Sequence, residues 1–216
     1  TPDLTLFPYT TLFRSKKRLL NSIRIAIKKQ YPSYSDDKMD EIMYGIEGIY
    51  LTITKTIVIF ILAFILKIAK ELLFLLITFN FIRMFAFGMH ANKSWICLLF
   101  SSILFLGGAF LSKYIVLDKV VLYLLYLIAF ILVAAYAPAD TVKRPLIKKK
   151  KRIRFKILSV IVVISYFIIT LLITNNLIIN VLIFGLIIEC ILISPLTYKA
   201  FKMPYKNYKN YGLNTK

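Results

Sequence analysis

Acidic residues are scarce in this chain: ten Asp and Glu oppose 29 Lys and Arg among 216 residues, giving a formal net charge of +19. Histidine occurs once and cysteine twice, which is a poor ligand set for a metal and too little for a disulfide framework. We therefore expect no metal and no other cofactor. Long polar stretches are few as well, because 59% of the residues are hydrophobic. That composition excludes an ordinary soluble domain.

The excess of positive charge has two explanations, binding to nucleic acid or insertion in a membrane. The Lys and Arg residues lie between apolar segments, where the cytoplasmic loops of membrane proteins carry them. We therefore expect anionic membrane lipids among the partners and no nucleic acid.

The first fifteen residues, TPDLTLFPYTTLFRS, differ in character from the rest. LFPYTTLFRS resembles the translation of a sequencing-library adapter, so we expect residues 1–15 to be a non-native tail; the alternative is a genuine short N-terminal tail. Residues 16–38 are expected to form a basic amphipathic helix that lies on an anionic leaflet, followed by a linker. Asp36 or Asp37 is expected to cap the helix that follows.

Apolar residues dominate six further segments, each close to the length that crosses about 30 Å of hydrocarbon as a helix. These segments are 43–66, 72–89, 95–112, 115–137, 157–175 and 178–196. None alternates in the ten-residue units that a membrane β-barrel requires. The sequence therefore predicts an all-α polytopic membrane protein, with six transmembrane helices in a domain over 39–198 and a basic tail over 199–216.

Lys and Arg are unevenly distributed between the loops. They concentrate before the first span, in the 138–156 loop and in the 199–216 tail, all on one side if six helices alternate. The positive-inside rule then puts both termini and the 90–94 loop in the cytoplasm. The densest run, Lys148, Lys149, Lys150, Lys151 and Arg152, is explained by topology and by binding to anionic lipid.

The single histidine, His90, lies seven residues before Cys97. On one straight helix the two would be about 10 Å apart along the axis, too far for a hydrogen bond. Asn92 or Ser94 can cap a new helix near Trp95, which would put Cys97 in a first turn where the helix dipole favours a thiolate. His90 could then fold back to serve as its base. Separately, His90 could be an interfacial side chain and Cys97 an apolar filler.

Three motifs resemble the AgrB family, the membrane endopeptidases of Gram-positive quorum sensing. RMFAFGMHANKSWIC matches its catalytic segment at four positions, Arg83, Gly88, His90 and Cys97. YAPADTVKRP at 136–145 matches a second signature, and YGIE at 44–47 matches a fainter third. The similarity covers about residues 40–200.

The resemblance implies a cysteine endopeptidase of the plasma membrane of a Gram-positive bacterium, with its site at the cytoplasmic side. Cys97 would attack a backbone carbonyl of an AgrD-like precursor peptide with His90 as base, releasing the precursor's C-terminal tail. A thiol or hydroxyl within the precursor would then close a thiolactone or lactone. In this setting Lys148–Arg152 could also dock an acidic precursor tail. A homodimer is compatible with these expectations.

The supporting residues expected for this site are Arg83, Gly88, Glu47, Ser94 and Glu189. Arg83 could hold a carboxylate of the peptide or pair with an internal acid. An ionisable group within a span is costly and usually functional, so either glutamate could orient the histidine or neutralise the arginine. Glu189 could instead pair with a lysine of the first span.

Two residues are expected to have no catalytic role. Asp140 interrupts the YAPA signature region at a position where some relatives are apolar, and Cys190 lies in GLIIECILI as a packing residue. Two other functions stay open: a small transporter or permease component, and a non-enzymatic membrane scaffold. Neither needs the spacing of His90 and Cys97.

Overall fold

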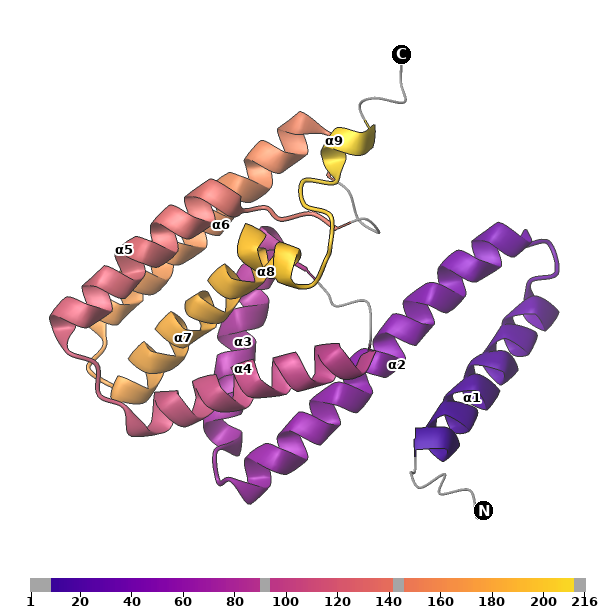
Figure 1. Cartoon of the computed structure of the whole chain (residues 1–216), viewed down its shortest axis with the longest axis horizontal. Coiled ribbons are helices and arrows are strands. Elements are labelled where there is room, and N and C mark those ends of the chain that lie inside the picture. Colours follow the sequence, from indigo (N-terminus) through magenta and orange to yellow (C-terminus); the bar gives the residue numbers. More distant parts are fainter. Residues whose placement is uncertain (1–8, 90–93, 142–145, 212–216) are drawn as a thin grey trace. The chain divides into compact units, whose positions relative to one another are not determined.

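The computed structural model describes residues 9–89, 94–141 and 146–211. The regular elements in these ranges are all helices: α1 (Tyr9–Gln30), α2 (Asp36–Ile65), α3 (Ala69–Ala86), α4 (Ser94–Tyr114), α5 (Lys119–Tyr136), α6 (Lys149–Leu172), α7 (Asn176–Ile193), α8 (Pro195–Ala200) and α9 (Tyr208–Tyr211) (Figure 1). The all-α prediction is therefore confirmed. The chain divides into two compact units, Thr1–Ile57 and Val58–Lys216, which are described separately below.

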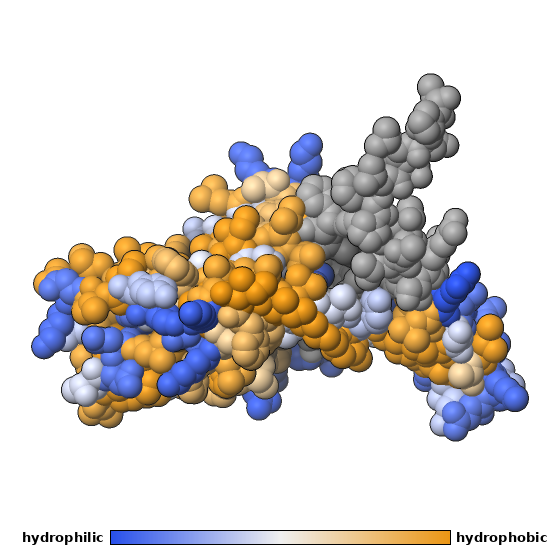
Figure 2. Space-filling view, turned by 90° about the horizontal axis from the view of Figure 1, so that it is seen from below, coloured by the Kyte–Doolittle hydropathy of each residue, from blue (hydrophilic) through white to orange (hydrophobic). Residues whose placement is uncertain are grey.

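Five helices of the described chain are long and apolar enough to cross a membrane: α2, α4, α5, α6 and α7. The predicted span 72–89 corresponds to α3, which has 18 residues but carries Lys70, Glu71 and Arg83. Apolar residues also cover most of the face shown in Figure 2, with hydrophilic residues gathered in separate groups. The polytopic membrane fold is thus confirmed, while the count of six spans stays a prediction.

In the first unit, α1 begins at Tyr9, earlier than the expected start near residue 16. The predicted cap of α2 is wrong: the hydroxyl of Ser35 accepts the N–H of Lys38 at 3.3 Å, and Asp36 lies in the first turn of the helix. A serine hydroxyl is well suited to this position because it satisfies an N–H that has no partner within the helix. That residues 1–15 are non-native stays a prediction.

Ion pairs join α1 to the start of α2. Arg24 contacts Asp40 and Lys28 contacts Asp36, each at 2.9 Å. Both pairs are largely exposed, so each stabilises the helix hairpin by at most about 1 kcal/mol.

Two boundaries in the second unit differ from the prediction. The basic run expected in a loop forms the first turns of α6, because Lys and Arg are good helix formers although they lower the hydropathy that marks a span. The expected 199–216 tail contains the end of α8 and the short helix α9, and Asn207 within it is buried.

The centre of the second unit is α7, which contacts α3, α4, α5, α6 and α8. Of its most apolar 18-residue window, 61% is buried, against at most 28% for the other candidate spans. Apolar side chains on one side of α7 pack with α3 and α4, and those on another side pack with α5 and α6. From Asn180 to Ile193, the residues of α7 are therefore buried or half-buried among the neighbouring helices.

Polar side chains join these helices within the apolar core. The hydroxyl of Thr78 on α3 donates to the carbonyl of Val181 at 3.1 Å, and that of Tyr166 on α6 donates to the carbonyl of Thr78 at 2.8 Å. Gly185 lies at the same crossing, where a Cβ would come within 2.8 Å of the Thr78 hydroxyl. The missing side chain thus allows α3 and α7 to approach closely.

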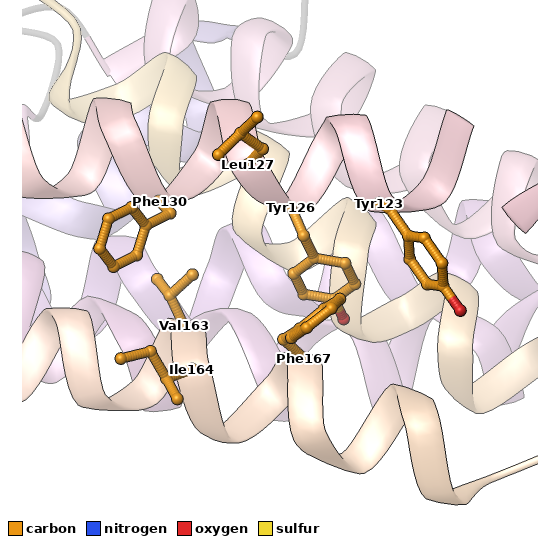
Figure 3. Close-up of a pocket in the computed structure, with 7 residues that line it drawn as sticks. All are labelled: Tyr123, Tyr126, Leu127, Phe130, Val163, Ile164 and Phe167. Carbon is orange, nitrogen blue, oxygen red and sulfur yellow. The ribbon is translucent and has the colours of Figure 1, made fainter. Parts of the chain in front are cut away.

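An apolar cavity of about 210 Å³ lies between α5 and α6. Aromatic and aliphatic side chains line it: Tyr123, Tyr126, Leu127, Phe130, Val163, Ile164 and Phe167 (Figure 3). This lining suits an apolar group and includes none of the residues predicted to catalyse.

Candidate functional site

Two separate helices flank the segment that contains His90. Helix α3 ends at Ala86 and α4 begins at Ser94, so the helical course is interrupted before Cys97; a break between His90 and Cys97 themselves stays a prediction, because residues 90–93 lie outside the described ranges. Cys97 is the fourth residue of α4, within its first turn, and is half-buried. His90 and Asn92 lie outside the described residues. The first turn of a helix presents backbone N–H groups without helical partners, which favour negative charge nearby.

The residues after α3 turn back instead of continuing outward. Phe87 and Gly88 both have positive φ angles, 61° and 113°. The carbonyl of Ala86 accepts the N–H of Ala139 at 2.9 Å, and the N–H of Gly88 donates to the carbonyl of Ala139 at 2.8 Å. The N–H of Met89 donates to the carbonyl of Leu192 at 3.2 Å. Three backbone hydrogen bonds therefore fix residues 86–89, which we call the fold-back segment.

Arg83 links this segment to the central helix. Its Nη1 contacts Oε2 of Glu189 at 3.3 Å, and its Nη2 donates to the carbonyl of Met89 at 2.8 Å. The side chain of Glu189 is fully buried, and its Oε1 has no hydrogen-bond partner among the described residues. Of the alternatives that the sequence left open for Glu189, the structure pairs it with Arg83. The guanidinium thus holds the carbonyl of the residue that immediately precedes His90.

Gly88 is packed against this arginine. A Cβ built at Gly88 would come within 2.0 Å of Arg83 Nη1 and 3.1 Å of the carbonyl oxygen of Leu192. The φ angle of 113° is also one that residues with side chains rarely adopt. Both constraints require glycine here.

We expect Gly88→Ala to reduce the peptide processing that the resemblance implies by more than about tenfold, because a displaced Arg83 no longer positions Met89. The measurement is turnover of a precursor peptide by membranes that contain equal amounts of each variant. Gly107→Ala is the matched control, since no atom lies within 4 Å of a Cβ at that helical position. Equal activity of the two variants would contradict the role given to Gly88.

Asp140, in the second signature region, is 3% exposed and forms hydrogen bonds with residues near the C-terminal end of the described chain. Its Oδ1 accepts the N–H of Asn207 at 3.0 Å, and its Oδ2 accepts the N–H of Tyr208 at 2.8 Å. The carboxylate is therefore engaged by backbone donors, in keeping with the expectation that it does not catalyse.

The basic run does not form one continuous surface. Arg152 donates to the carbonyls of Leu146 and Ile147, both at 3.0 Å, and its guanidinium lies 3.8 Å from the ring centre of Tyr208. Lys150, in contrast, is exposed and borders an open groove on α6 with Arg154 and neighbouring aliphatic side chains. Arg152 therefore supports the structure, which leaves its exposed neighbours available to a partner.

The other residues predicted for the site are placed as follows. Ser94 is the first residue of α4, and Glu47 is half-buried on α2 in the first unit. Cys190 is buried in the core formed by α5, α6 and α7, as expected for a packing residue. Within the described ranges, no three His, Cys, Asp or Glu side chains gather in a way that would hold a metal ion.

Sequence reasoning missed the residues that attach the C-terminal segment to the site, above all Tyr198 and Asn207. Tyr198 is 1% exposed and Asn207 is 2% exposed. The only signal was the alternation of aromatic and polar residues in FKMPYKNYKNY, which is unusual for a solvated basic tail.

Comparison with known proteins identifies the family. The family model for accessory gene regulator B matches residues 21–193, which begins earlier than the region of resemblance expected from the motifs. An AgrB-like protein of Clostridium acetobutylicum is 33% identical over 76% of this chain and 78% of its own. The accessory gene regulator protein B of Staphylococcus aureus is 32% identical over 73% of this chain and 82% of its own.

An AgrB-like protein of Listeria innocua is 29% identical over 79% of this chain and 84% of its own. No solved structure matches the chain. The extent of the family match and the identity to these relatives show that the chain belongs to the accessory gene regulator B family.

Proposed function

We propose that the chain is a membrane cysteine endopeptidase that processes an AgrD-like precursor peptide for quorum sensing. Family membership supports a role in the processing of accessory gene regulator peptides and disfavours the transporter and scaffold alternatives. Cys97 is the proposed nucleophile and His90 the proposed base. The observation that carries this assignment is the position of Cys97 in the first turn of α4, the next described helix after the fold-back segment.

The reaction begins when Cys97 Sγ attacks the carbonyl carbon of the scissile peptide bond. His90 takes the thiol proton and delivers it to the nitrogen of the leaving tail, so the C–N bond breaks and a thioester to Cys97 remains. A thiol of the precursor then attacks that thioester carbonyl. The new ring is a thiolactone, and Cys97 recovers its proton; with a hydroxyl in place of the thiol the ring is a lactone.

Exchange of one thioester for another is nearly balanced in free energy, whereas hydrolysis would be strongly downhill. The site must therefore keep water away from the acyl-enzyme. Gly88 and Met89 are buried, and Cys97 is half-buried. These surroundings support ring closure over hydrolysis.

The direct test is co-expression with a precursor peptide that is encoded by a neighbouring gene, followed by mass spectrometry of the peptide products. We expect a released C-terminal tail and an N-terminal fragment that is lighter by one water than its linear counterpart. A linear N-terminal fragment alone would contradict cyclisation, and an uncleaved precursor would contradict the peptidase.

The exposed lysines of the basic run are proposed to dock an acidic precursor tail. We expect replacement of Lys149 and Lys150 by glutamine to raise the KM for precursor, with a weaker effect at high salt because ions screen the attraction. Arg152→Gln is the comparison, since it should destabilise the fold through Tyr208. A KM that is unchanged at every salt concentration would leave the lysines a role in topology or lipid binding only.

We also propose that both termini and the site face the cytoplasm of a Gram-positive cell, because the basic loops share one side if six helices alternate. Reporter fusions after Lys216 and within 148–152 should then behave as cytoplasmic, and a fusion at 113–114 as external. The reverse pattern would refute this orientation.

A further inference from the structure

The last part of the described chain is firmly held rather than loosely attached. We call residues 198–208 the C-terminal strap. The carbonyl of Asp140 accepts the hydroxyl of Tyr198 at 3.0 Å and Nδ2 of Asn207 at 3.3 Å. Its carboxylate accepts the backbone N–H groups of Asn207 and Tyr208 in the strap, and that of Leu146 at 3.4 Å. Burial raises the pKa of Tyr198 above its ordinary value, so this hydroxyl stays protonated and donates.

The same strap contacts the helix that carries the nucleophile. The ring of Phe201 packs edge-on against that of Phe100 on α4, with 4.9 Å between the ring centres. Phe100 follows Cys97 by three residues, and residues three apart lie on neighbouring parts of a helix surface. A displacement of the strap at Phe201 therefore acts on the first turns of α4.

Asp140 also connects the strap to the fold-back segment. It follows Ala139, whose N–H and carbonyl form hydrogen bonds with Ala86 and Gly88. The short stretch 137–140 thus forms hydrogen bonds in two directions. Ala139 bonds to the fold-back segment, and Asp140 bonds to the strap. The carboxylate accepts backbone N–H groups from Leu146, Asn207 and Tyr208, so it makes the most hydrogen bonds in this connection.

We infer that the C-terminal strap is a built-in brace that fixes the start of α4 relative to the fold-back segment, with Asp140 as its positioning residue. The inference rests on the proposed peptidase function for its effect on turnover. It concerns residues beyond position 193, where the family match ends. The brace acts by setting the position of the start of α4 relative to the fold-back segment.

The experiment compares Asp140→Ala with Phe201→Ala, each with Cys190→Ala so that Cys97 is the only thiol. Asp118→Asn is the matched control: it removes a carboxylate at the N-cap of α5, where an asparagine oxygen can still accept the N–H of Val120. Three readouts are taken on the full chain in membranes. They are tryptic cleavage after Lys206, the kcat and KM for precursor, and the pH dependence of Cys97 alkylation by iodoacetamide.

We expect Asp140→Ala to speed cleavage after Lys206 by about tenfold and to lower kcat by about tenfold, while KM changes by less than about twofold. The pH dependence of Cys97 alkylation should change in the same direction as it does when His90, the proposed base, is replaced by glutamine. Phe201→Ala should lower kcat although it leaves the hydrogen bonds of Asp140 in place. Phe201→Tyr, which retains the aromatic ring, should have the kcat of the parent. Asp118→Asn should match the parent in all three readouts.

Cleavage that is unchanged in Asp140→Ala would overturn the role of Asp140. If Asp140→Ala speeds tryptic cleavage after Lys206 but leaves kcat and the pH dependence of Cys97 alkylation unchanged, the inference that the strap braces the site is wrong. If the parent protein releases no tail at all, the peptidase proposal fails, and the alkylation profile then decides alone: a shift upon Asp140→Ala supports the brace, and no shift refutes it.

Discussion

Cys97→Ala is expected to abolish release of the precursor's C-terminal tail, with a loss on the order of 10⁴-fold or more. Without the thiol no covalent intermediate forms, and the remaining groups can only bind and orient the peptide. Cys97→Ser should be nearly as inactive, because a hydroxyl is far less acidic than a thiol and an imidazole is a modest base. The measurement is tail release in membranes under conditions of single turnover.

Both Cys97 variants should still bind the precursor, since the side chain forms a bond rather than a large contact surface. His90→Gln should lose about 10²- to 10⁴-fold of the rate with binding retained. Cys190→Ala is the matched control and should be close to silent, because this buried thiol packs in the core. Tail release by Cys97→Ala, or its loss in Cys190→Ala, would mean that the nucleophile is misassigned.

The second large effect is expected at the buried ion pair. Glu189→Leu should destabilise the fold by about 3–5 kcal/mol, because it leaves the largely buried guanidinium of Arg83 without a counter-charge in the protein interior. Adding Arg83→Met should recover most of this stability, since a packed apolar pair is often as stable as a buried ion pair. Thermal unfolding in detergent measures both changes.

The double variant separates folding from function. We expect it to fold without processing precursor, because Met89 loses the hydrogen bond that Arg83 donates to its carbonyl. Asp40→Asn, at a largely exposed pair in the first unit, should cost at most about 1 kcal/mol. Full activity in the folded double variant would show that the pair contributes stability alone.

The start of α4 just before Cys97 could be predicted because its signal is local. ANKS contains residues that cap helices, and seven residues of continuous helix would keep a base and a nucleophile apart. The fold-back segment could not be predicted. Its hydrogen-bond partners are the backbone N–H and carbonyl of Ala139 and the backbone carbonyl of Leu192, and no particular side chain marks such groups in a sequence.

The pairing of Glu189 shows the limit of reasoning from charge. Several cations were compatible partners, and only the packing of α7 against α3 brings Arg83 to it. The start of α6 was missed for another reason. Hydropathy indicates where a helix becomes apolar enough to enter hydrocarbon. It does not detect polar helical turns that precede this point, such as the turn formed by Lys149–Arg152.

The backbone bonding of the fold-back segment bears on how far such sequences can diverge. Its hydrogen bonds use the backbone N–H and carbonyl of Ala139 and the carbonyl of Leu192, so substitutions other than proline at residue 139 leave the bonds available. Few positions are restricted in their side chain: chiefly residue 88, which must be glycine, and residue 83, which must supply a guanidinium. Relatives that share about a third of their residues with this chain can therefore retain the same local geometry.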